Sequence, residues 1–174
     1  MRYRRSIVAG GTYFFTANLA IRSQDKLVKH VDLLRDAFRA VLARHPFDIV
    51  ATVVLPDHLH AVWRLPSGDS DYPLRWSLIK SHFSRSLPKV EHIRDARRNK
   101  RERGIWQRRY WEHQIRDDRD LQNHVDYIHY NPVKHGYVVN AVDWPHSSIH
   151  RYIASDMLPP RWAQGVPDNG NFGE

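Results

Sequence analysis

The sequence predicts a single α+β domain in which helices pack against the faces of an antiparallel β-sheet. Three observations favour this fold class. Segments with the two-residue period of strands and segments with the 3.6-residue period of helices follow one another in mixed order. Two strand-like segments are separated only by Pro56 and Asp57, as in an antiparallel hairpin. The length of 174 residues is sufficient for one hydrophobic core and short for two.

The N-terminal half is expected to contain a strand, a helix and the hairpin. Residues 12–20 are rich in aromatic and β-prone side chains, which favours a strand. A helix follows, because apolar residues recur at spacings of three and four, and His45 and Pro46 end it. Its apolar face is formed by Leu27, Val31, Leu34, Phe38 and Val41. Residues 47–55 and 58–65 form the hairpin.

Two further helices and one strand are expected in the C-terminal half. Residues 74–87 form a helix with an apolar side and a basic side, and residues 94–104 form an arginine-rich loop. Residues 106–115 form a strand in which aromatic residues are interleaved with arginine. The inward residues of the helix are Ile79, Phe83 and Leu87, and its basic residues are Arg75, Lys80 and Arg85.

The last expected helix begins at a cluster of aspartates. Asp117, Asp118 and Asp120 cap a helix and complement its dipole. The helix should end near Asn131, because a residue that precedes proline disfavours helical geometry. Its apolar stripe is Leu121, Val125 and Ile128. The domain is therefore expected to span residues 1–153, with residues 154–174 as a loosely ordered tail rich in Pro, Gly and Asn.

Composition limits the possible functions. The chain has 27 Lys and Arg against 19 Asp and Glu, a net charge of +8, which favours a polyanionic partner such as nucleic acid. No apolar run reaches the roughly 20 residues of a membrane span. Cysteine is absent, which excludes disulfides, thiolate metal sites and cysteine nucleophiles. A cytoplasmic location with association to the nucleoid is expected.

His58 and His60 form the first candidate for chemistry. Residues two apart on a strand share a face, so both imidazoles can reach one metal ion. Imidazole suits transition metals, and added oxygen ligands extend the choice to Mg²⁺ or Mn²⁺. The alternative interpretation is two ordinary histidines that lie on the surface or make hydrogen bonds.

Tyr127 and Asn131 form the second candidate, because residues four apart share one face of a helix. A phenol can act as a covalent nucleophile when a metal or a base activates it. The alternative is a packing tyrosine whose hydroxyl meets water.

A third group combines aromatic and basic side chains. Aromatic rings can stack on unpaired bases, and Lys and Arg pair with phosphates. The alternative for the tryptophans is a place in the core. The residues expected to contact nucleic acid are Arg4, Arg5, Arg75, Lys80, Arg85, Trp106, Arg108 and Arg109.

Four segments together resemble a known family. Residues 55–60, Leu-Pro-Asp-His-Leu-His, resemble the HUH motif of single-tyrosine transposases, in which U is a bulky hydrophobic residue. Residues 106–115, 127–136 and 144–148 are similar in order and spacing to the REP-associated tyrosine transposases of bacteria. The resemblance extends over roughly residues 3–153, nearly the whole chain.

The resemblance implies a fold, an activity and a site. The fold would be the small HUH endonuclease sandwich, ferredoxin-like and similar to RNA-recognition domains. The activity would be metal-dependent nicking and joining of single-stranded DNA at palindromic repeat hairpins, through a 5′-phosphotyrosine. Tyr127 would be the nucleophile, and His58, His60 and Asn131 would hold Mg²⁺ or Mn²⁺. Relatives among the insertion sequences commonly carry Gln where this chain has Asn131.

Two other functions remain compatible with the residues. One is a non-catalytic protein that binds DNA hairpins, which the presence of all the supposed active-site residues disfavours. The other is a metal-dependent hydrolase of small phosphoesters, which the charge and the lack of a glycine-rich phosphate loop disfavour. The sequence does not decide between a monomer and a homodimer.

Overall fold

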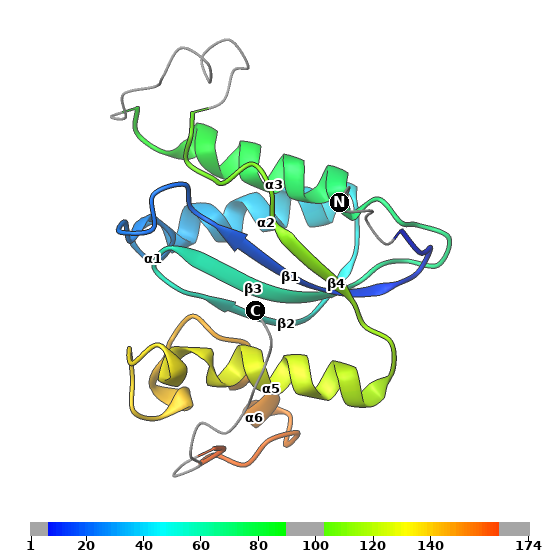
Figure 1. Cartoon of the computed structure of the whole chain (residues 1–174), viewed down its shortest axis with the longest axis vertical. Coiled ribbons are helices and arrows are strands. Elements are labelled where there is room, and N and C mark those ends of the chain that lie inside the picture. The colour runs from blue at the N-terminus through cyan, green and yellow to red at the C-terminus, as the bar shows by residue number, and fades with distance from the viewer. Residues whose placement is uncertain (1–6, 90–102, 164–174) are drawn as a thin grey trace, which may run out of the picture.

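The computed structural model describes residues 7–89 and 103–163. A four-stranded antiparallel sheet with the order β2-β3-β1-β4 lies between two layers of helices (Figure 1). Helices α2 and α3 cover one face, and α5 and α6 lie on the other. The elements are β1 Thr12–Asn18, α1 Lys26–Lys29, α2 Val31–Arg44, β2 Asp48–Val54, β3 His58–Arg64, α3 Tyr72–Ser86, β4 Trp111–Gln114, α5 Asp118–Lys134, the 3₁₀ helix η1 Ala141–Asp143 and α6 Ile149–Ala154. This strand order, with α2 and α3 as crossovers, is ferredoxin-like, and it confirms the predicted α+β class.

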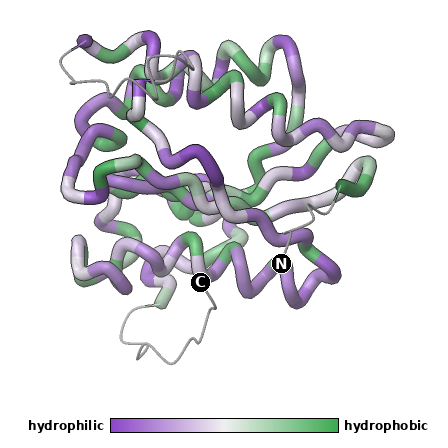
Figure 2. Tube along the Cα trace, turned by 45° about the horizontal axis from the view of Figure 1, so that its top comes forward, coloured by the Kyte–Doolittle hydropathy of each residue, from purple (hydrophilic) through white to green (hydrophobic). Residues whose placement is uncertain are grey.

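The alternation along β3 separates a largely apolar core from the candidate site. Leu59, Ala61 and Trp63 belong to the core under α2 and α3. His58 and His60 point to the opposite face, which α5 covers. Hydrophobic and hydrophilic segments alternate along the helices (Figure 2), as expected for helices that bury one side. The period of two residues predicted for this strand is therefore confirmed.

Two predicted elements are shorter in the structure than expected. The first helix is divided at His30, which has φ −119° and ψ 35°, so that α1 and α2 are separate. In the predicted strand 106–115, only Trp111–Gln114 is a strand. Leu19 pairs with Trp106, and Thr16 pairs with Trp111. Three residue positions from Thr16 to Leu19 therefore lie opposite five positions from Trp106 to Trp111. The unequal number of residues between these two pairs interrupts the regular ladder.

Helix α5 begins as predicted, with the Asp117 carboxylate accepting a hydrogen bond of 2.8 Å from the Asp120 N–H. The predicted end near Asn131 is wrong, because the helix continues through Pro132 to Lys134. Proline has a helical φ and removes only one donor, and the His135 N–H still bonds to the Asn131 carbonyl at 3.0 Å. Asn131 is consequently a side chain on the helix face rather than a cap.

The segment after η1 closes the edge of the sheet at β2. The Val54 N–H bonds to the His146 carbonyl and the Ser148 N–H to the Thr52 carbonyl, both at 2.8 Å. His129 of α5 and the Ser148 hydroxyl are 2.9 Å apart. This segment therefore ties α5 to the sheet. Among residues 7–89 and 103–163, no helix has the length and apolarity needed to cross a membrane. The boundary at residue 153 stays a prediction, and residues 164–174 of the expected tail lie outside the described residues.

Candidate functional site

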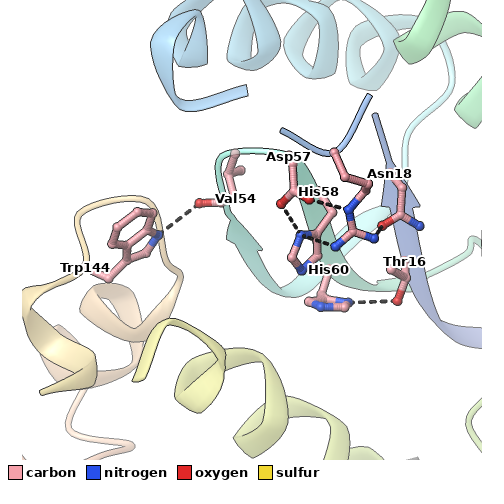
Figure 3. A network of polar contacts seen from close by, with 8 residues as sticks. Thr16, Asn18, Val54, Asp57, His58, His60 and Trp144 are labelled. Atoms are coloured by element: carbon pink, nitrogen blue, oxygen red, sulfur yellow. Dashed lines mark hydrogen bonds and ion pairs between the residues drawn. The ribbon is translucent and has the colours of Figure 1, made fainter. Parts of the chain in front are cut away.

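The two histidines of β3 lie side by side beneath α5. Their ring centroids are 5.0 Å apart, and the side chains are 3% and 1% exposed. Figure 3 shows both rings on the same side of the strand, each with a polar partner from the surrounding chain. The predicted shared face is confirmed. Burial contradicts a surface position for the two histidines, whereas the alternative of hydrogen-bonding histidines is left open.

Each histidine is held through its Nδ1 atom. His58 Nδ1–H donates to Asp57 Oδ1 over 2.7 Å, and the Thr16 hydroxyl lies 2.8 Å from His60 Nδ1 (Figure 3). Arg22 pairs with the other oxygen of Asp57. A hydrogen bond at one ring nitrogen fixes the ring and directs the other nitrogen to a ligand, as around metal-bound histidines. In both residues Nε2 is therefore the atom available to bind.

Electrostatics keep these rings in the form that binds metals. Burial lowers the pKa of His58, although the hydrogen bond to Asp57 works in the opposite direction. Burial also holds the pKa of His60 well below its usual value, with the charge of His58 adding to the effect. Both imidazoles are consequently neutral near pH 7, with a lone pair for a cation.

Helix α5 places Tyr127 against the histidines. The centroids of the Tyr127 and His60 rings are 5.2 Å apart, edge to face, and those of His135 and His58 are also 5.2 Å apart. Tyr127 is 5% exposed, and Lys134 Nζ lies 4.9 Å from its ring centroid. Asn131 lies between Tyr127 and His135 at the helical spacing of four, so all three share the helix face toward β3.

The polar atoms around this point fit a bound cation. Asn131 is fully buried, and within the described residues neither atom of its amide has a hydrogen-bond partner. The same is true of His60 Nε2. A buried polar group without a partner costs roughly 1–3 kcal/mol, and a cation at this point would satisfy the Asn131 oxygen and His60 Nε2 together. Two imidazole nitrogens and an amide oxygen are a suitable donor set for a divalent metal ion.

Asp57, Thr16 and Arg22 support the site, although the sequence did not identify them as functional residues. Asp57 offered a signal, since a carboxylate directly before the first histidine can orient its ring. Thr16 and Arg22 offered none, because β1 pairing places Thr16 opposite His60 across 44 positions of sequence. Asn18 completes the group, since its side-chain oxygen accepts from Arg22 at 2.8 Å.

A basic cleft of about 600 Å³ lies along α3 and contains four of the predicted DNA-contacting residues. These are Lys80, Arg85, Trp106 and Arg108. Lys80 Nζ donates to the Gln107 carbonyl at 3.0 Å and lies 5.7 Å from the Trp106 ring centroid. Trp106 is 7% exposed and packs on Phe83, so its ring is largely in the core. Arg109 is exposed but does not line the cleft.

The structure corrects the expectation for Arg75. Its side chain is buried, 2% exposed, and its guanidinium bonds to both oxygens of Asp69 at 3.1 and 2.6 Å. It also donates to the carbonyls of His45, Pro46 and Asp71. A guanidinium whose donors are all directed into the protein holds the start of α3 and has no donor left for a phosphate. Arg4 and Arg5 lie outside the described residues.

The cleft and the histidine pair are on opposite faces of the sheet, but the end of β1 connects them. The Gln107 N–H, beside the cleft, donates to the Asn18 carbonyl at 2.9 Å. The Asn18 side chain accepts from Arg22, which pairs with Asp57 next to His58. A strand of nucleic acid that passes over this end of the sheet could therefore touch both features.

Comparisons with known proteins identify relatives of this chain. A REP-associated tyrosine transposase of Haemophilus influenzae is 47% identical over 167 residues, which is 95% of this chain and 94% of that protein. The one of Escherichia coli is 43% identical over 166 residues, 95% of this chain and 93% of that protein. A solved structure of a REP-associated tyrosine transposase bound to a REP hairpin superposes with a TM-score of 0.84 at 42% identity, covering 100% and 97% of the two chains. No model of a protein family matches the sequence.

Proposed function

This chain belongs to the REP-associated tyrosine transposases, and we propose that it cuts and rejoins single-stranded DNA beside palindromic hairpins, with Tyr127 as the nucleophile. The observation that carries the proposal is the meeting of α5 and β3. A buried tyrosine ring, a fully buried amide without partners and two neutral imidazoles converge there. A cation bound between α5 and β3 would give partners to the Asn131 oxygen and to His60 Nε2, which have none within the described residues.

In the proposed mechanism, Nε2 of His58 and of His60 and the amide oxygen of Asn131 would hold Mg²⁺ or Mn²⁺. Such a cation would supply positive charge that stabilises the reacting phosphate. The Tyr127 oxygen attacks phosphorus and gives its proton to solvent, while the bond from phosphorus to the 3′ oxygen breaks and that oxygen takes up a proton from solvent. A 5′-phosphotyrosine and a free 3′-hydroxyl result. The number of phosphate esters is unchanged, so the reverse attack by a 3′-hydroxyl rejoins DNA without an external energy source.

The proposal is tested by incubating the full chain with end-labelled hairpin DNA that carries a single-stranded flank, with Mg²⁺ or Mn²⁺. A covalent protein–DNA adduct that survives denaturation supports the transposase chemistry. Tight binding without an adduct would indicate a protein that only binds hairpins. A protein that does neither but hydrolyses a small phosphoester would be the third class of function considered.

Asn131→Ala is expected to raise the metal concentration required for half-maximal cleavage by about tenfold or more, and excess Mn²⁺ should partly restore the rate. The reason is the loss of one oxygen ligand while the two imidazoles remain. Asn131→Gln, which keeps the amide, should retain more activity than Asn131→Ala. Metal titrations of cleavage by the three proteins provide the measurement.

A melting curve of Asn131→Ala provides the control for this prediction. If Asn131 only supported the helix, the variant would lose thermal stability and keep the metal dependence of the native protein. The amide has no hydrogen-bond partner among the described residues, so its removal should cost little stability or even increase it. An unchanged metal titration would contradict a role of Asn131 as a ligand.

DNA affinity is expected to fall steeply with salt, because each phosphate neutralised by Lys or Arg releases counterions. On single-stranded DNA, the slope of log K against log salt should be about −0.7 for each contact. Arg108→Ala in the cleft should make the slope less negative by about that amount. Arg39→Ala on α2, an exposed arginine that pairs with Asp36, is the matched control. A slope near zero for the native protein would show that its charge does not serve DNA binding.

A further inference from the structure

A second group of metal-ligating side chains lies at the beginning of the helix that carries Tyr127. His113 comes from β4, and Asp120 and His124 come from the first turns of α5. One ligand atom from each of the three residues lies within 4.8 Å of the other two. His113 Nε2 is 2.9 Å from Asp120 Oδ2, and His124 Nδ1 is 3.2 Å from Asp120 Oδ1. The two imidazole rings are stacked, with centroids 4.7 Å apart and planes 17° apart.

We propose that His113, Asp120 and His124 form a second metal site, which takes a divalent transition-metal ion of the Zn²⁺ class. A tetrahedral Zn²⁺ ion with bonds of about 2.0–2.2 Å requires ligand atoms roughly 3.3 Å apart. His113 Nε2 and His124 Nδ1 lie 2.9 and 3.2 Å from different oxygens of Asp120, and the three ligand atoms all lie within 4.8 Å of one another. Small side-chain rotations would bring them to the tetrahedral spacing. Two imidazoles and one carboxylate are a frequent ligand set for such ions, and the fourth position is left for water.

The two histidines can bind the ion without a change in the number of protons that they carry. In the metal-free protein, His113 Nε2 donates to the Asp120 carboxylate and His124 Nδ1 donates to the Asp120 backbone carbonyl. When the ion binds, each neutral ring carries its proton on the other nitrogen, so that His113 Nε2 and His124 Nδ1 become ligands. Nδ1 of His124 also gives up its bond of 2.8 Å to the Asp120 carbonyl.

Arg116 is the group that competes with the ion for Asp120. Its backbone N–H donates to Asp120 Oδ2 at 3.0 Å, and its Nε lies 3.4 Å from the same oxygen. Its side chain is 76% exposed, so this ion pair is weak and easily rearranged. The other carboxylate oxygen stays free for the ion, since a carboxylate offers two acceptor atoms.

The position of the site gives the ion a structural consequence. The ion would clamp the short strand β4 to the start of α5. His124 packs on Phe14 with centroids 4.8 Å apart, and Phe14 lies 5.5 Å from the His60 ring and 5.9 Å from the Tyr127 ring. A metal ion here would therefore fix the position of α5 on the sheet one helical turn from the proposed nucleophile.

Zn²⁺ binding to the full chain tests the proposal independently of any activity. Because His58 and His60 can also bind Zn²⁺, the measurement uses a background in which both are alanine. Isothermal titration calorimetry should show one equivalent of Zn²⁺ bound in this background. Adding His113→Gln or His124→Gln should weaken that binding by more than about 100-fold, beyond the 10–100-fold typical of an outer-shell partner. Circular dichroism should show that every variant is folded.

His150→Gln serves as the matched control, since His150 is an exposed histidine on α6 away from both groups. It should leave Zn²⁺ binding unchanged. Replacing Zn²⁺ by Co²⁺ adds a spectroscopic readout, because a tetrahedral Co²⁺ site absorbs visible light strongly and Co²⁺ in water does not. The proposal is overturned if Zn²⁺ binding persists when both His113 and His124 are replaced, or if no equivalent binds in the folded background variant.

Discussion

Tyr127→Phe is expected to abolish the covalent protein–DNA adduct completely while hairpin affinity stays within about twofold of the native value. The substitution removes only the attacking oxygen. The ring itself is 5% exposed and remains packed against Phe14 and His60, so α5 keeps its place on the sheet. Denaturing gel electrophoresis of labelled hairpin DNA measures the adduct, and a filter-binding titration measures the affinity.

Tyr130→Phe is the matched control for this prediction. It removes a phenol oxygen from the same helix, three residues along and from a more exposed position, and it should leave adduct formation intact. Persistent adduct in Tyr127→Phe would assign the nucleophile to another residue, with Tyr130 and Tyr110 the next to test. If adduct formation and hairpin affinity were lost together, the Tyr127 hydroxyl would instead contribute to DNA binding or to the stability of the fold.

Local patterns in the sequence predicted the part of the site that depends on single elements. The alternation along β3 placed His58 and His60 on one face, and helical spacing placed Tyr127 and Asn131 on another. Both predictions concern residues two or four positions apart, where strand and helix geometry determine the outcome. That the two faces meet is a tertiary fact, and only the resemblance to a family indicated it in advance.

The errors arose where packing or pairing overrode a local rule. Arg75 was assigned to the basic side of α3, yet it lies on the stripe of Tyr72, Trp76 and Ile79, because Asp69 and three backbone carbonyls satisfy its charge. Its spacing of four from Ile79 was a usable signal. Pro132 was expected to stop α5, but the helix continues at the loss of a single hydrogen bond.

In the proposed second metal site too, local spacing predicts one part and strand pairing determines the rest. Asp120 and His124 are four apart on α5, so their proximity could be predicted from the sequence. His113 joins them because β4 pairs with β1 and leads directly into the helix, and this pairing is not visible in the local pattern. Consequently the chain carries two distinct sets of histidines, and chemistry that depends on a metal must be assigned to one of them.

His60→Ala is expected to reduce cleavage by about 10³-fold or more, which corresponds to roughly 4 kcal/mol of lost transition-state stabilisation. The variant removes the Nε2 atom that has no partner within the described residues. It also removes the Nδ1 atom that is the hydrogen-bond partner of the Thr16 hydroxyl. His129→Gln is the matched control, because His129 is also a fully buried histidine but bonds to Ser148 on the far side of α5. His129→Gln should lower the stability of the protein and keep the cleavage rate within a few-fold of the native rate.

Chelation completes the assignment, because it strips every metal ion from the protein at once. EDTA should abolish cleavage by the native protein, and Mg²⁺ or Mn²⁺ added back should restore it.

If Zn²⁺ at His113, Asp120 and His124 only fixes α5, then His113→Gln should lower the melting temperature of the Zn²⁺-loaded protein and retain cleavage in Mg²⁺ or Mn²⁺. The loss in His60→Ala should persist at any metal concentration that restores the native protein. Full cleavage in EDTA would refute the metal requirement, and equal losses in His60→Ala and His129→Gln would reduce the histidine pair to a structural role.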